Sequence, residues 1–154
     1  MGEVVSIVYK PKRSRKRADG YVRVPLEQTT LIEGYGIEGD AKGGHHSRQI
    51  NIMALESLET LKAAGYDTAP GRMGEQIIVK GVDIESLQPG DRVQLGESVI
   101  EVTKPRTGCD KFEAFQGKTR APVPQMGMMA KVITGGALRV GDPAGIVQAE
   151  PQGK

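Results

Sequence analysis

The sequence predicts a mostly β fold, a closed or partly closed β-barrel with a few short helices. Three observations support this prediction. Short β-branched or alternating apolar runs recur along the 154 residues, 21 glycines can supply the tight turns between them, and one stretch alone has a clear helical period. Because helices do not alternate with the strands, a doubly wound α/β fold is not expected. We treat residues 1–154 as a single barrel domain, since a chain of this length can bury its own core.

The strand candidates follow one another from the N-terminus to the C-terminus. Runs typical of strands lie at 4–9, 21–24, 26–32, 49–53, 76–79, 92–95, 98–103, 128–134, 137–140 and 144–147. Regular pairing of the strand at 98–103 should stop at Pro105, because proline lacks the N–H that a ladder needs. Two segments, Leu87-Gln-Pro-Gly-Asp91 and Leu138-Arg-Val-Gly-Asp142, place Gly-Asp before an apolar strand. This echo fits two equivalent corners of a barrel.

Residues 54–64 are predicted to form the one substantial helix. Good helix formers separate three leucines that fall on one side, at positions 55, 58 and 61. Gly65 follows as a C-terminal stop. We expect this helix to cover the barrel as a lid, and we expect a single further helical turn at 83–87.

Composition and charge narrow the class of protein. No apolar run approaches the about 20 residues that span a bilayer, and the N-terminus lacks the pattern of a secretory signal. We therefore expect a cytoplasmic protein without a membrane partner. Six basic residues lie between positions 10 and 17 with no aromatic residue among them. Such a tract is more typical of a solvated loop than of a nucleic-acid interface, so we do not expect nucleic acid as a partner.

The only cysteine, Cys109, is the main candidate for chemistry. A single thiol cannot form an internal disulfide or supply the about four ligands of a structural zinc site. The ordinary role of a free cysteine is that of a small buried apolar residue. Here Lys104 and Arg106 precede it, and Asp110 has the capping-box spacing that predicts a short helix over 111–116. Positive charge and helix amides favour a thiolate, which can attack, carry sulfur or bind a soft metal.

A polar, glycine-rich loop over 39–48 is the second candidate region. It contains Asp40, His45 and His46 and leads into a predicted strand, where side chains often carry function. Adjacent histidines on a strand point to opposite sides, and no CxxC or HxxxH spacing supports a metal cage. We therefore favour a loop-ordering or substrate-contacting role for them over metal ligation. A nucleophilic pair between Cys109 and either histidine stays open.

The order and spacing of several short motifs resemble the MOSC domain, which occurs at the C-terminus of molybdenum cofactor sulfurases and as free-standing bacterial proteins. The resemblance extends over nearly the whole chain. The segments that carry it are Gly36-Ile-Glu-Gly-Asp40, Arg48-Gln49, Glu56, Gly74-Glu75, Gly81-Val-Asp83, Leu87, Gly90-Asp91, Pro105-Arg106, Cys109, Gly136 and Gly141-Asp142. The chain departs from the family at Gln76, where many members continue Gly-Glu with Asn, and it lacks the extra cysteines that some relatives carry.

The resemblance implies a barrel with a cysteine at its pocket, and that position falls on Cys109. In the family this cysteine is held to carry sulfur as a persulfide or to ligate molybdenum in a pterin-bound cofactor. Some members reduce N-hydroxylated compounds at that metal. The basic residues that would hold the phosphate of the cofactor are then to be found among Lys42, Arg48, Lys104 and Arg106.

The resemblance does not choose between a molybdenum-dependent oxidoreductase and a sulfur-transfer protein. The chain contains no aminotransferase-like sulfurase domain, so we expect no pyridoxal phosphate chemistry and a separate protein that supplies sulfur or the molybdenum cofactor. A redox partner would serve the oxidoreductase. Two alternatives stay open: a non-catalytic ligand- or partner-binding barrel with an incidental cysteine, and a cofactor-independent hydrolase or transferase that uses Cys109 with a histidine.

Overall fold

The computed structural model describes residues 2–11, 16–17, 20–21, 24–40, 43–45, 48–66, 68–69, 74–107 and 125–147. Within these ranges the protein is mostly β. The strands are β1 (Gly2–Tyr9), β2 (Lys16–Arg17), β3 (Gly20–Tyr21), β4 (Val24–Leu26), β5 (Gln28–Ile32), β6 (Gly36–Ile37), β7 (Ile50–Ala54), β8 (Ile77–Lys80), β9 (Arg92–Leu95), β10 (Ser98–Thr107), β11 (Gln125–Thr134), β12 (Gly136–Arg139) and β13 (Pro143–Val147). The helix α1 spans Leu55–Ala63, and the 3₁₀ turn η1 spans Ile84–Ser86.

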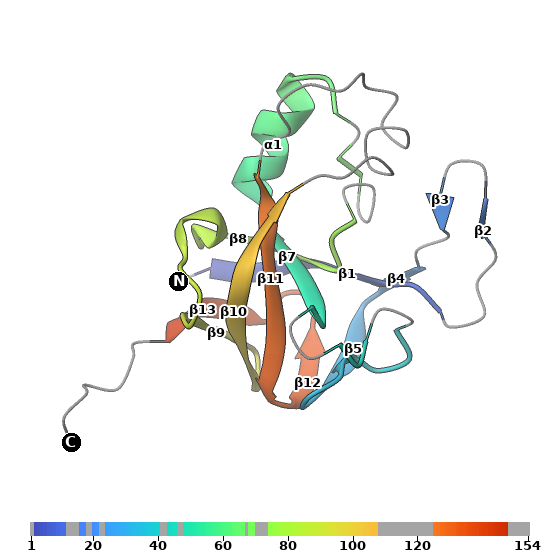
Figure 1. Ribbon diagram of the computed structural model, residues 1–154, viewed down its shortest axis with the longest axis vertical. Coiled ribbons are helices and arrows are strands. Elements are labelled where there is room, and N and C mark those ends of the chain that lie inside the picture. The colour runs from blue at the N-terminus through green and yellow to red at the C-terminus, as the bar shows by residue number, and fades with distance from the viewer. Residues whose placement is uncertain are drawn as a thin grey trace.

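Seven of these strands close into a barrel (Figure 1). Their order is β13-β9-β10-β11-β7-β8-β1, and β13 also pairs with β1, which joins the two ends of the sheet. The pair β7–β8 is parallel, and α1 forms the crossover that a parallel pair requires. β4 continues the sheet beyond β1. The sequence-based prediction of a closed barrel is confirmed.

Two smaller sheets flank the barrel. β12, β5 and β6 form one of them, and β6 delivers the chain to Asp40. β2 pairs with β3 in a hairpin that stands apart from the barrel in Figure 1. Lys16–Arg17 was expected in a loop, and this expectation is wrong, because backbone pairing there does not need the apolar alternation from which strands were predicted. Among the described residues no helix is long and apolar enough to cross a membrane.

Aliphatic side chains fill the barrel, and α1 covers part of its outer wall. Ile100 and Val102 of β10 are buried in the interior, and their spacing of two residues places both on the same face of the strand. On the outside, Leu58 and Leu61 of α1 pack with Met53 of β7 and Ile78 of β8. The predicted helix and its role as a cover on the barrel are thus confirmed.

The two Gly-Asp corners have the same geometry. Gly90 and Gly141 both have φ +98°, a conformation that residues with a Cβ rarely adopt. In each corner the aspartate that follows accepts a hydrogen bond at Oδ2 from a backbone N–H three residues earlier, at 2.8 Å for Asp91 and 2.9 Å for Asp142. The prediction of two equivalent corners is therefore confirmed.

Pro105 does not end the pairing of β10, contrary to the sequence-based expectation. It pairs with Met128 of β11, and the ladder continues to Thr107 through one irregularity of register, between Pro105 and Thr107. β9 pairs with β10 only over Ser98–Glu101, so among the described residues β11 is the only strand that pairs with β10 at Pro105. Proline is tolerated on such an edge because no ladder bond is needed on the other side.

Candidate functional site

A polar stretch of the outer barrel wall lies beside the part that α1 covers. Ile52 of β7 and Ile77 of β8 point into the barrel. Asn51 and Gln76, each one residue earlier, face outward by the alternation of strands. Their main chains are also joined, because the N–H of Gln76 donates to the carbonyl of Asn51 at 2.9 Å. The parallel pairing of β7 and β8 is thus extended by one residue.

Asp40 is buried against this wall and is fully inaccessible to solvent. Its Oδ1 accepts a hydrogen bond from the backbone N–H of Lys10 at 3.1 Å, and its Oδ2 accepts one from Nε2 of Gln76 at 2.9 Å. A carboxylate has only acceptors, so both of these bonds suit it. The aspartate therefore joins the 39–48 loop to the ends of β1 and β8.

Gln76 and Asn51 continue the hydrogen-bonded chain from Asp40. Oε1 of Gln76 accepts from the backbone N–H of Asn51 at 2.7 Å, and Nδ2 of Asn51 donates to the carbonyl of Gly74 at 3.2 Å. Gln76 is 2 % exposed and Asn51 is half-buried. A buried glutamine with both ends of its amide bonded is held in one orientation.

Arg106 lies at the other end of this chain, against Gly74. Gly74 has φ +83°, and a Cβ at this position would lie 2.4 Å from Nη2 of Arg106. A side chain at residue 74 would therefore displace the guanidinium as well as strain the backbone. Arg106 is half-buried near the end of β10, and its guanidinium packs directly against the backbone of Gly74.

Tyr35 contacts the polar loop over 39–48 through its hydroxyl, its carbonyl and its ring. Its hydroxyl donates to the carbonyl of Asp40 at 2.6 Å, and its carbonyl accepts from the N–H of Gly44 at 2.9 Å. Its ring lies against Gly43, where a Cβ would come within 2.4 Å of Cε2. Asp40, Gly43 and Gly44 are thus arranged around one aromatic ring.

The predicted site residues occupy three kinds of position. Asp40 is buried, Arg106 is half-buried, and His45, Arg48 and Lys104 are exposed. Asp40 lies at one end of the hydrogen-bonded chain, and Arg106, far from it in sequence, packs against Gly74 at the other end. Lys42, His46, Cys109 and the predicted helix at 111–116 lie outside the described residues. In the part of the chain that the structure describes, no three His, Cys, Asp or Glu side chains form a metal-binding group.

Sequence reasoning missed the uncharged members of the site. Tyr35, Asn51 and Gln76 bear no charge, and the latter two occupy the polar positions of alternating runs, which usually face solvent. The one feature of the sequence that drew attention to any of them was Gln76, which stands where the family resemblance leads one to expect asparagine. Glutamine is one methylene longer, and its amide spans from the N–H of Asn51 to Oδ2 of Asp40.

The half-buried carboxyl of Glu85 lies where η1 meets α1. Burial raises the pKa of Glu85, although the hydroxyl of Ser57 donates to its Oε1 and the backbone of Ala54 also bonds to it. Desolvation therefore outweighs these hydrogen bonds and favours the protonated form.

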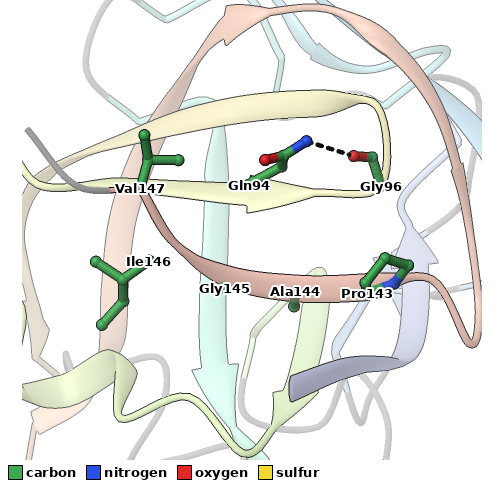
Figure 2. Close-up of a pocket in the computed structure, with 7 residues that line it drawn as sticks. All are labelled: Gln94, Gly96, Pro143, Ala144, Gly145, Ile146 and Val147. Atoms are coloured by element: carbon green, nitrogen blue, oxygen red, sulfur yellow. Dashed lines mark hydrogen bonds between the residues drawn. The ribbon is translucent and has the colours of Figure 1, made fainter. Parts of the chain in front are cut away.

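A shallow concave surface is formed by β9 and β13 (Figure 2). It is lined by Gln94, Gly96 and the five residues of β13, and Nε2 of Gln94 donates to the carbonyl of Gly96 at 3.2 Å. Ile146 is 53 % exposed there. No lining side chain is ionisable or nucleophilic, so this surface offers no groups for catalysis.

The family model of the MOSC domain matches residues 39–144. The chain belongs to the MOSC domain family. The matched range begins one residue before Asp40 and includes Asn51, Gln76 and Arg106. The hydrogen-bonded chain described above is therefore part of the MOSC domain itself.

Solved structures show the same MOSC fold. YiiM from Geobacillus stearothermophilus is 18 % identical, with a TM-score of 0.71 over 96 % of this chain and 76 % of that one. YiiM from Escherichia coli is 22 % identical, with a TM-score of 0.61 over 96 % and 71 % of the two chains. The YuaD protein from Bacillus subtilis is 19 % identical, with a TM-score of 0.63 over 94 % of each chain. No curated protein sequence matches this chain.

Proposed function

We propose that this MOSC protein binds a molybdenum-pterin cofactor through Cys109 and the basic residues that precede it, or carries sulfur on the same thiol. The observation that supports the proposal is the basic end of β10. Arg106 is seated on Gly74, and Lys104 is exposed two residues earlier. Cys109 follows the end of β10 at Thr107 by two residues, a separation that spans at most about 7 Å.

The residue types at this end of β10 fit the chemistry of such a cofactor. The planar guanidinium of Arg106 can donate two parallel hydrogen bonds to a phosphate group, and the ammonium of Lys104 adds a mobile positive charge. The same charges favour the thiolate of Cys109, which is a soft ligand. A bound cofactor would supply redox chemistry at molybdenum, and the chain would bind its phosphate and hold its metal.

Loading of the Cys109→Ser variant tests the role of the thiol. Wild type and variant are produced together with a cofactor supplier, and molybdenum, pterin and intact mass are measured on the purified proteins. We expect metal and pterin, or the mass of one added sulfur atom, on the wild type alone, with equal unfolding midpoints. Normal loading of the variant would refute the role of Cys109.

Arg106→Ala tests the phosphate contact, with Arg139→Ala as the matched control. Arg139 is exposed on β12, so its loss removes the same charge from another place. Loss of a charge-assisted bidentate contact should lower pterin content or affinity by about tenfold to a hundredfold in Arg106→Ala. Equal loading of both variants would contradict the assignment. An empty wild type with a slowly alkylating Cys109 would instead favour a non-catalytic binding barrel.

A further inference from the structure

We infer that Gln76 is a positioning residue for Arg106. The side-chain amide of Gln76 accepts a hydrogen bond from Asn51, and Asn51 donates one to the carbonyl of Gly74. The guanidinium of Arg106 packs against Gly74. The inference rests on the proposed function, because the anion that Arg106 would receive is the phosphate of the cofactor. The hydrogen bonds and the close contact that carry it all lie among the described residues.

The direction of the hydrogen bonds is set by two backbone N–H groups. One, from Lys10, donates to Asp40 Oδ1, and the other, from Asn51, donates to Gln76 Oε1. A side-chain amide can rotate by half a turn and exchange its oxygen for its nitrogen, whereas a backbone N–H remains a donor. The amide of Gln76 must therefore keep Oε1 toward Asn51.

With Oε1 held in this way, Nε2 of Gln76 needs an acceptor on its other side. Asp40 Oδ2 provides it at 2.9 Å, and both side chains are almost fully buried, at 0 % and 2 % exposure. Water has little access there to replace a lost partner, so an inverted or shortened side chain would leave a buried donor unsatisfied. Glutamine at position 76 and a carboxylate at position 40 are thus matched.

Asn51 connects the fixed amide of Gln76 to Gly74, against which Arg106 packs. Its main chain is bonded to Gln76 on both sides, through the N–H to Oε1 and through the carbonyl to the N–H of Gln76. Its side chain then donates to the carbonyl of Gly74 at 3.2 Å. Gly74 has no Cβ, so the guanidinium lies directly against its backbone. Release of Gln76 should loosen this surface and the arginine on it.

Side-chain NMR of the full chain tests the positioning directly. The Nε–Hε signal of Arg106, assigned by its disappearance in Arg106→Lys, reports the order of the guanidinium. We expect an ordered signal in the wild type and a disordered one in Gln76→Leu, with the signal of Arg139 unchanged in both. Asn51→Ala should have the same effect while keeping both backbone anchors, so it replaces Gln76→Leu if the latter does not fold. An ordered Arg106 in the variant that folds would overturn the inference.

Binding of inorganic phosphate, measured by titration calorimetry, separates this inference from the proposed function. We expect Gln76→Leu to weaken phosphate affinity by about tenfold, and to have no further effect when Arg106 is already lysine. Phosphate binding that depends on Arg106 and not on Gln76 would overturn the inference and leave the proposed function intact. If the wild type binds no phosphate, the proposed phosphate site fails, and the order of Arg106 in the NMR measurement decides the positioning role.

Discussion

Asp40→Asn should destabilise the protein far more than its chemical similarity suggests. Both carboxylate oxygens of Asp40 face donors, the backbone N–H of Lys10 and Nε2 of Gln76. The asparagine amide has one oxygen, so its nitrogen must face one of these donors in either orientation. Gln76 cannot rotate to relieve the conflict, because its Oε1 is held by the backbone N–H of Asn51.

The magnitude follows from the burial of these groups. An unsatisfied buried donor costs about 1–3 kcal/mol, and the remaining bond loses the strengthening that a charged acceptor gives. We expect a total loss of about 3 kcal/mol in the free energy of unfolding. For a domain of this size, such a loss lowers the melting temperature by about 6–12 °C.

Urea unfolding, followed by far-UV circular dichroism, measures this loss. We expect the urea concentration at the unfolding midpoint to fall while the slope of the free energy against urea concentration stays constant. Asp91→Asn is the matched control, because Asp91 also accepts a backbone N–H, from Gln88 at 2.8 Å, in an exposed corner. There an amide oxygen can still accept the bond while its nitrogen meets water, so the loss should stay below about 0.5 kcal/mol. Equal losses in the two variants would refute the argument from hydrogen-bond direction.

Two further predictions concern the packing and the titration of the fold. Gly127→Ala should lower the free energy of unfolding by about 3 kcal/mol or more, because its Cβ would lie 2.2 Å from the carbonyl oxygen of Ile52. Gly141→Ala is the control, since open space surrounds this glycine, and its positive φ should cost only about 1 kcal/mol. Equal losses in urea unfolding would contradict the close approach at Gly127. Burial raises the pKa of Glu85 above 4.5, so the stability that this group confers is full below that value and is lost as pH rises through the raised pKa. Glu85→Gln should therefore gain stability relative to wild type as the pH rises through the raised pKa of Glu85, and a difference that does not change with pH would contradict the effect of burial.

Much of the barrel could be predicted because its signals are local. Alternation identified the strand at 98–103, which contributes Ile100 and Val102 to the core, and leucine spacing identified the helix that covers β7 and β8. The two Gly-Asp corners were visible because a left-handed turn has few residue choices. Whether β10 continues past Pro105 could not be predicted from nearby residues, because it depends on where β9 stops pairing with β10.

The candidate site was predicted only in its charged members. Asp40 and Arg106 stood out by residue type and by resemblance to MOSC domains, while Gln76 and Asn51 looked like ordinary outward positions of strands. Their roles become visible only through their partners. The roles of Lys42, His46 and Cys109 stay predictions, because these residues lie outside the described part of the chain.

The sequence by itself determined the strand-rich architecture, the single thiol and the basic residues that precede it, because residue type and short-range periodicity carry that information. The tertiary structure decided which polar groups meet. Asp40 and Gln76 are 36 positions apart, and their bond exists only because the chain brings the end of β6 to the start of β8. Hydrogen-bond direction is then imposed by backbone donors on both sides, a constraint that no local pattern of residues contains.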